Sequence, residues 1–289
     1  DKAMEDLDFG VNIRYNHGKS ALDYMMGNEY NPIHPYAPVD ALNYTGTTGE
    51  LFTRGFTHFK VLDDLWEQTL GIGYSQTNRN YSNWDPNLPY NLSGDYQGTK
   101  IKGDWQNIFR LHPHNTLTLG LEDEEDQMMN ESEGLGTQSY NTQGYYLSDQ
   151  FNLFDRSFST ASVRYSDNNR SGSKVTWSLT EAVLFNETGS KLKGNVGTGF
   201  KVPTLYELNA PFYGDTLDED TGSPLLLRPR NKGNFEANYR FLKNADVNFM
   251  IIAVGEKDGV LGTRVPGYAI ANLAGSYQVH PNVKLFARY

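Results

Sequence analysis

The chain has 289 residues, contains no cysteine and carries a formal net charge of −10. The absence of cysteine excludes a disulfide framework and thiolate metal sites, and the acidic balance argues against a nucleic-acid groove. No apolar run approaches the roughly 18 residues of a spanning helix, so an α-helical membrane protein is excluded as well.

The chain opens with a strongly alternating segment. Apolar and polar residues take turns from Leu7 to His17. This period of two predicts a β-strand with one apolar and one polar face. A long polar connection with three prolines follows over residues 18–50. The apolar positions of the strand are Leu7, Phe9, Val11, Ile13 and Tyr15.

The same alternation recurs along the rest of the chain and predicts about thirteen strands. Most are about ten residues or longer, and short connections alternate with long ones. After the first strand, the predicted strands are Leu51–Lys60, Trp66–Asn80, Ile101–Leu111, Thr116–Gln127, Tyr145–Leu153, Ser157–Ser166, Lys174–Phe185, a strand from Ser190, Arg230–Phe241, Asp246–Glu256, Gly267–Val279 and Val283–Tyr289.

This pattern predicts an all-β protein, a transmembrane antiparallel β-barrel with an apolar outer face and a polar lumen. A soluble sandwich or propeller also alternates, but its strands are shorter and a second sheet could not bury charged faces cheaply. Glu181 is an exception on the apolar face of its strand, and a bulge or a lumenal contact would explain it. Aromatic residues near strand ends fit an interfacial girdle: Tyr15, Trp66, Tyr74, Tyr145, Tyr165, Trp177 and Tyr277.

The most distinctive stretch runs from Ser190 to Phe212, where a strand breaks at Pro203 into a loop rich in aromatic residues. The sequence GTGFKVPTLYEL at Gly197–Leu208 closely resembles a barrel segment of TonB-dependent outer-membrane receptors, nearest the cobalamin-receptor branch. Val163–Leu208, Leu225–Phe241 and Val265–Tyr289 resemble further strands of the same family.

The resemblance implies a protein of the bacterial outer membrane that imports a scarce, bulky nutrient. Cobalamin is the first candidate for this nutrient, and a ferric siderophore or haem is the second. The implied partners are the lipid bilayer, the nutrient and the TonB complex, which acts through an N-terminal plug. The alternatives from other classes are a passive channel or scaffold barrel, and an outer-membrane barrel enzyme.

The sequence also departs from the family pattern. Receptors of this family resemble 22-stranded barrels, whereas about 13–14 strands are visible here. The 289 residues contain no plug-like sequence and no signal peptide, so we expect these segments to lie outside them. Only about twenty residues separate the loop after Pro203 from Leu225. We therefore expect residues 1–289 to form a partial barrel. The first and last strands are not expected to pair directly, because that seam would be parallel.

The candidate ligand-binding residues are aromatic residues assigned to loops, whose rings could stack on a nutrient or instead pack the loops and the girdle. They are Tyr81, Trp84, Tyr206, Phe212 and Tyr213. A calcium site is the candidate cofactor site, since loop carboxylates are the ligands that Ca²⁺ prefers. Its residues are Asp215, Asp218 and Asp220, and the resemblance implies a similar use of acidic loops in cobalamin-binding relatives.

No catalytic constellation stands out. The six histidines show no metal-ligand spacing, and no GxSxG nucleophile motif is present. The acidic run Glu122–Asp126 is interpreted as a solvated strand end. The sequence therefore predicts a protein that is not an enzyme.

Overall fold

The computed structural model describes residues 6–21, 25–26, 39–40, 44–83, 92–132, 134–209, 229, 231–258 and 263–289. Almost all of them lie in strands. The long strands are β1 (Asp6–Ala21), β4 (Tyr44–Val61), β5 (Trp66–Asn83), β6 (Leu92–His112), β7 (Asn115–Asn130), β8 (Gly136–Leu153), β9 (Ser157–Asn168), β10 (Gly172–Phe185), β11 (Ser190–Thr198), β12 (Asn231–Leu242), β13 (Ala245–Val254), β16 (Tyr268–His280) and β17 (Val283–Arg288). The minor elements are β2 (Met25–Met26), β3 (Val39–Asp40), β14 (Lys257–Asp258), β15 (Arg264–Val265) and helix α1 (Leu205–Asn209).

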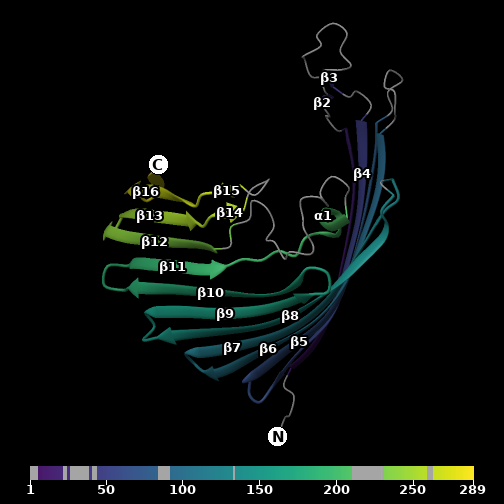
Figure 1. The fold of residues 1–289 in the computed structure, drawn as a ribbon. Coiled ribbons are helices and arrows are strands. Elements are labelled where there is room, and N and C mark those ends of the chain that lie inside the picture. Colours follow the sequence, from purple (N-terminus) through teal and green to yellow (C-terminus); the bar gives the residue numbers. More distant parts are fainter. Residues whose placement is uncertain are drawn as a thin grey trace.

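The long strands form one antiparallel sheet of 13 strands in the order β1-β4-β5-β6-β7-β8-β9-β10-β11-β12-β13-β16-β17. The predicted strand number and fold class are thus confirmed. Figure 1 shows a strongly curved sheet with α1 inside the curve. In the described part, β1 and β17 are the two edges and do not pair with each other, as predicted. The path of residues 214–226 lies outside the described residues.

The two faces of the sheet differ sharply in chemistry. Because directly opposed residues share a face, the register shows to which face of the sheet each residue belongs. Val11 lies opposite Gly55, which lies opposite Ile72, and this row belongs to the apolar face. Phe9 and Ile13 on that face are 77% and 70% exposed. A single-layer sheet cannot bury such side chains in itself, so the apolar face requires an apolar surrounding.

The connections at one rim of the sheet are all short, and the long connections lie at the other rim, together with the shorter turns 131–135 and 169–171. In the turn Leu153–Arg156 the amide of Arg156 donates to the carbonyl of Leu153 at 3.1 Å, and Phe154 and Asp155 have φ values of 57° and 52°. Positive φ values at both central residues give the turn the twist that matches the flanking strands. No helix among the described residues is long and apolar enough to cross a membrane.

Several strands extend further toward the long-connection rim than predicted. The predicted strand ends at Asn80 and Gln127 and the predicted strand starts at Ile101 and Tyr145 were wrong, because β5 continues to Asn83, β6 begins at Leu92, β7 continues to Asn130 and β8 begins at Gly136. The extensions show no regular alternation of apolar and polar residues, so hydrophobic periodicity does not reveal them. One consequence is that Tyr81 lies in strand β5 and not in a loop. Similarly, Tyr206 lies in helix α1, which the sequence analysis assigned to a loop.

Candidate functional site

The middle of the polar face carries a ladder of ion pairs, which we call the charge ladder. Lys100 and Lys102 on β6 lie opposite Asp126 and Glu124 on β7. Lys100 pairs with Glu124 at 2.5 Å and with Asp126 at 3.3 Å, and Lys102 pairs with Glu122 at 3.0 Å. The run Glu122–Asp126 lies within β7, so its interpretation as a strand end was wrong. Glu122, Glu124 and Asp126 neutralise the cations of β6, whereas Asp123 and Glu125 are exposed on the opposite face.

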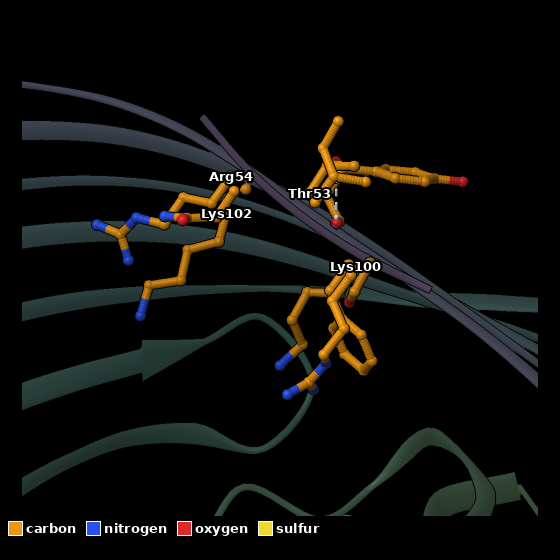
Figure 2. Close-up of a pocket in the computed structure, with 11 residues that line it drawn as sticks. Thr53, Arg54, Lys100 and Lys102 are labelled. Carbon is orange, nitrogen blue, oxygen red and sulfur yellow. Dashed lines mark hydrogen bonds between the residues drawn. The ribbon is translucent and has the colours of Figure 1, made fainter. Parts of the chain in front are cut away.

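Neighbouring strands extend the charge ladder on both sides. Arg54 on β4 pairs with Asp104 at 2.7 Å, and Arg164 on β9 donates to Glu122 at 2.7 Å. Figure 2 shows Arg54, Lys100 and Lys102 around a cavity of about 610 Å³. Thr53 belongs to the opposite face of the sheet, and its hydroxyl donates to the carbonyl of Tyr74 at 3.3 Å. Such a wall of paired charges suits a wet or polar-filled space, since desolvation of the ions would be costly.

Four tyrosines gather above the charge ladder, at the long-connection end of the polar face. The ring of Tyr81 stacks on that of Tyr96, with centroids 5.7 Å apart, and meets Tyr44 edge-on at 5.8 Å. Tyr96 in turn meets Tyr206 of α1 edge-on at 5.9 Å. The hydroxyls of Tyr81 and Tyr96 are 3.3 Å apart. The tyrosines border a cavity of about 910 Å³, which we call the tyrosine pocket.

Helix α1 reaches the pocket because a reciprocal capping box starts it. The amide of Glu207 donates to the hydroxyl of Thr204 at 3.1 Å, and the amide of Thr204 donates to the carboxylate of Glu207 at 2.7 Å. This is the T-x-x-E pattern that satisfies the free amides of a first helical turn. Leu205, only 5% exposed, anchors the helix, which contacts β7 and β8. The anchored helix then presents Tyr206 to Tyr96.

Electrostatics reinforce this cap. Burial works to raise the pKa of Glu207, but hydrogen bonds from Thr204 and the nearby ammonium of Lys201 outweigh it and hold the pKa below its ordinary value of 4.5. The Lys201 ammonium lies 3.5 Å from the Glu207 carboxylate. Glu207 is therefore an anion at neutral pH, which is the form that the two hydrogen bonds from Thr204 require.

Arg79 gives the tyrosine pocket a cation. It lies opposite Thr48 on β4 and Tyr96 on β6, and it lines the cavity. No described residue forms an ion pair with Arg79, and no carboxylate is among the described residues that line the pocket. The pocket thus combines flat aromatic surfaces and hydroxyls with a guanidinium that presents five N–H donors. This combination suits a large ligand with a flat face and oxygen acceptors.

The structure places two of the predicted ligand-binding residues in one site. Tyr81 and Tyr206 lie on either side of Tyr96. The sequence analysis missed Tyr44 and Tyr96 because it began their strands too late. It placed Arg79 in a strand, but only the pairing with the neighbouring strands brings this residue to the pocket. The T-x-x-E pattern after Pro203 was the available signal for α1. Trp84, Phe212, Tyr213, Asp215, Asp218 and Asp220 lie outside the described residues.

Residues 5–219 match the family described as TonB dependent receptor-like, beta-barrel. The chain belongs to this family. It is 32% identical over 193 residues to the vitamin B12 transporter BtuB of Photobacterium profundum. That match covers 63% of this chain and 30% of the transporter, so the chain spans about a third of the curated relative. The resemblance found in the sequence is thereby confirmed.

Solved receptor structures share the fold. The ferric-catecholate import receptor Fiu of E. coli K12, in its open form, gives a TM-score of 0.60 at 14% identity, covering 98% of this chain and 44% of that one. The ferric yersiniabactin uptake receptor FyuA of Yersinia pestis gives 0.59 at 10% identity, covering 97% and 53%. The copper transporter OprC gives 0.57 at 11% identity, covering all of this chain and 56% of that one.

Membership of the family places the TonB-dependent receptor barrel in the outer membrane of Gram-negative bacteria. Its apolar face therefore contacts lipid and its polar face borders the lumen. Short turns of such barrels lie in the periplasm and long connections outside the cell. The tyrosine pocket accordingly lies at the extracellular end of the lumen wall, and the charge ladder lies below it.

Proposed function

We propose that this chain forms part of the lumen wall of a TonB-dependent receptor that imports a scarce, bulky nutrient. A cobalamin-type corrinoid is the first candidate, and a ferric siderophore or haem is the second. The observation that carries the proposal is the tyrosine pocket, because it joins three strands and α1 at the extracellular mouth. A nutrient that enters from outside passes this site at the mouth of the lumen.

The chemistry of the pocket supports such a ligand. A volume of about 910 Å³ lies at the upper end of the usual range for small-molecule sites. The rings of Tyr81, Tyr96 and Tyr206 offer stacking surface, and Arg79 offers hydrogen bonds to carboxamide, phosphate or catecholate oxygens. The relative named as a vitamin B12 transporter supports the corrinoid over the other candidates.

In this proposal the barrel performs no bond-making chemistry. The nutrient binds at the mouth, and the TonB complex supplies the energy from the periplasmic side through a plug. The charge ladder then serves as the wall against which that plug rests and moves. Its paired ions leave little net charge on the wall, so a polar plug can rest against it without trapping unpaired charge.

The test is a binding measurement on the complete receptor in detergent. Cyanocobalamin, a ferric catecholate siderophore and haem are titrated separately while tryptophan fluorescence is followed. We expect quenching by one of the three, and weaker affinity in the Arg79→Gln and Tyr206→Ala variants. Binding of none of the three would overturn the proposed nutrient class. Affinity unchanged in both variants would remove the tyrosine pocket from the binding site.

A further inference from the structure

Glu181 is a carboxylate on the lipid-facing side of the barrel. It lies in β10 between Leu179 and Val183, which share its face. The β9–β10 pairing runs without a register shift and sets Glu181 opposite Ser159. The two explanations that the sequence suggested, a bulge and a lumenal contact, are therefore both wrong. The carboxylate points toward lipid on a regular strand.

Two serines of β9 hold this carboxylate, and we call the three residues the Glu181 notch. The hydroxyl of Ser157 donates to Oε1 at 2.6 Å, and the hydroxyl of Ser159 donates to Oε2. Ser159 is 7% exposed, so the notch is recessed. Each carboxylate oxygen keeps a further lone pair for a donor. No cationic side chain among the described residues forms an ion pair with Glu181.

The notch lies at the level of the periplasmic lipid headgroups. Ser157 is the first residue of β9, directly after the periplasmic turn at residues 154–156. Ser159 and Glu181 are two residues further in, about 7 Å along the strand. Exposed apolar side chains frame this level, with Leu153 48% and Phe154 89% exposed. An ammonium group in the headgroup region can complement the charge of this carboxylate and donate to the lone pairs that the two serines leave open.

We propose that the Glu181 notch binds the ethanolamine headgroup of a phospholipid in the periplasmic leaflet. The primary ammonium of that headgroup donates up to three hydrogen bonds and complements the carboxylate in charge. A choline headgroup has no N–H to donate, and a glycerol headgroup leaves the lipid anionic. The apolar surface above the notch continues through Leu179 and Trp177, which is what the acyl chains of the same lipid would cover. This inference depends on the membrane location of the barrel and not on the nutrient.

The experiment measures which lipids the complete receptor retains. The receptor is reconstituted into nanodiscs with equal parts of phosphatidylethanolamine, phosphatidylcholine and phosphatidylglycerol and released in mild detergent, and the lipids that stay bound are identified by native mass spectrometry. We expect phosphatidylethanolamine to be retained in preference to phosphatidylcholine. Glu181→Gln should reduce that preference by about threefold, as for one partly exposed, hydrogen-bonded charge pair.

The matched control is Glu187→Gln. Glu187 lies in the next periplasmic turn and is already paired with Arg156 at 2.6 Å, so the variant should retain lipid as the wild type does. Should Glu181→Gln not fold, wild-type protein is compared across ethanolamine lipids with increasing N-methylation, where retention should fall as N–H donors are lost. Equal retention of all headgroups would overturn the proposal. An undiminished preference for phosphatidylethanolamine in Glu181→Gln would also overturn it. So would the finding that a protein, and not a lipid, binds the wild type in stoichiometric amount and is absent from Glu181→Gln.

Discussion

The ring of Tyr81 lies across the backbone of Gly94 on the adjacent strand. The two residues are directly opposed in the β5–β6 register. A Cβ atom at position 94 would lie 2.2 Å from a carbon of that ring, far inside van der Waals contact. Gly94 therefore allows the ring to lie flat, and the flat ring then stacks on Tyr96. The geometry of the tyrosine pocket thus depends on the absence of one side chain.

Gly94→Ala should displace the ring of Tyr81 and open the stack with Tyr96. Since an aromatic pair contributes about 0.5–1.5 kcal/mol, we expect nutrient affinity to fall by about threefold to tenfold. Titration of the complete receptor measures this. Gly103→Ala on the same strand is the control, because a Cβ there meets nothing within 4 Å. Equal affinity in the two variants would contradict the role given to Gly94.

The capping box makes the docking of α1 sensitive to acid. The folded-state pKa of Glu207 is lowered, so its contribution is complete above the ordinary value of 4.5 and is lost as the pH falls through the lower folded value. The Leu208 amide donates to the Thr204 carbonyl at 3.0 Å, and its hydrogen-exchange protection reports the helix. After correction for the intrinsic exchange rate of the amide, its protection should decrease when the pH is lowered below 4.5. At neutral pH the protection should stay unchanged.

Thr204→Ala removes the other half of the same box. Loss of an N-cap hydroxyl costs about 1 kcal/mol, so the protection of the Leu208 amide should fall about fivefold at neutral pH. Thr188→Ala is the control, since that hydroxyl lies in a periplasmic turn and donates to Ser190 at 2.8 Å. Unchanged protection in Thr204→Ala would show that packing of Leu205 alone holds the helix.

Glu122 joins two strands of the charge ladder by accepting from both Lys102 and Arg164. Glu122→Gln leaves two cations with weaker partners. Because these cations are partly exposed, we expect a loss of only about 1 kcal/mol in the free energy of unfolding. Urea titration in lipid vesicles measures this. Glu125→Gln, on the opposite face of the same strand, should change it by less than about 0.5 kcal/mol.

Calcium binding by Asp215, Asp218 and Asp220 stays a prediction. Three loop carboxylates offer the oxygen ligands that Ca²⁺ prefers, so chelation should weaken nutrient binding if they hold the ion. Calorimetric titration of Ca²⁺ into the chelated receptor measures the site directly. A triple Asp→Asn variant should abolish the heat of binding. Heat that persists in this variant would place the calcium site elsewhere.

The strands and their faces could be predicted from the sequence because each membrane-spanning segment has one apolar face. Lipid imposes a period of two that is visible at Leu7, Phe9 and Val11. The rows that the register assigns to the apolar face are those that alternation predicts. Glu181 departs from this pattern, and the reason for a carboxylate on the apolar face became visible only through its hydrogen bonds to Ser157 and Ser159 on the neighbouring strand.

The site was harder to predict because it lies where the alternation fades. Near the extracellular rim both faces of a strand are wet, so Tyr96 carries no apolar signal of its own. The pocket also depends on pairings across strands, such as Arg79 with Thr48 and Tyr96, that only the register reveals. Helix α1 is too short for a periodic signal and was marked only by Thr204 and Glu207.

The central claim is that the nutrient occupies the tyrosine pocket, and ligand protection tests it most directly. These 289 residues contain no cysteine, so a single thiol introduced here has no competing thiol within this part of the receptor, and the cysteine-unmodified receptor gives the background labelling. Thr77 lines the pocket, whereas Gln127 is exposed on the opposite face at a similar level. In the detergent-solubilised receptor, bound nutrient should slow maleimide labelling of Thr77→Cys and leave that of Gln127→Cys unchanged. Saturating nutrient that leaves Thr77→Cys as reactive as before would contradict the claim.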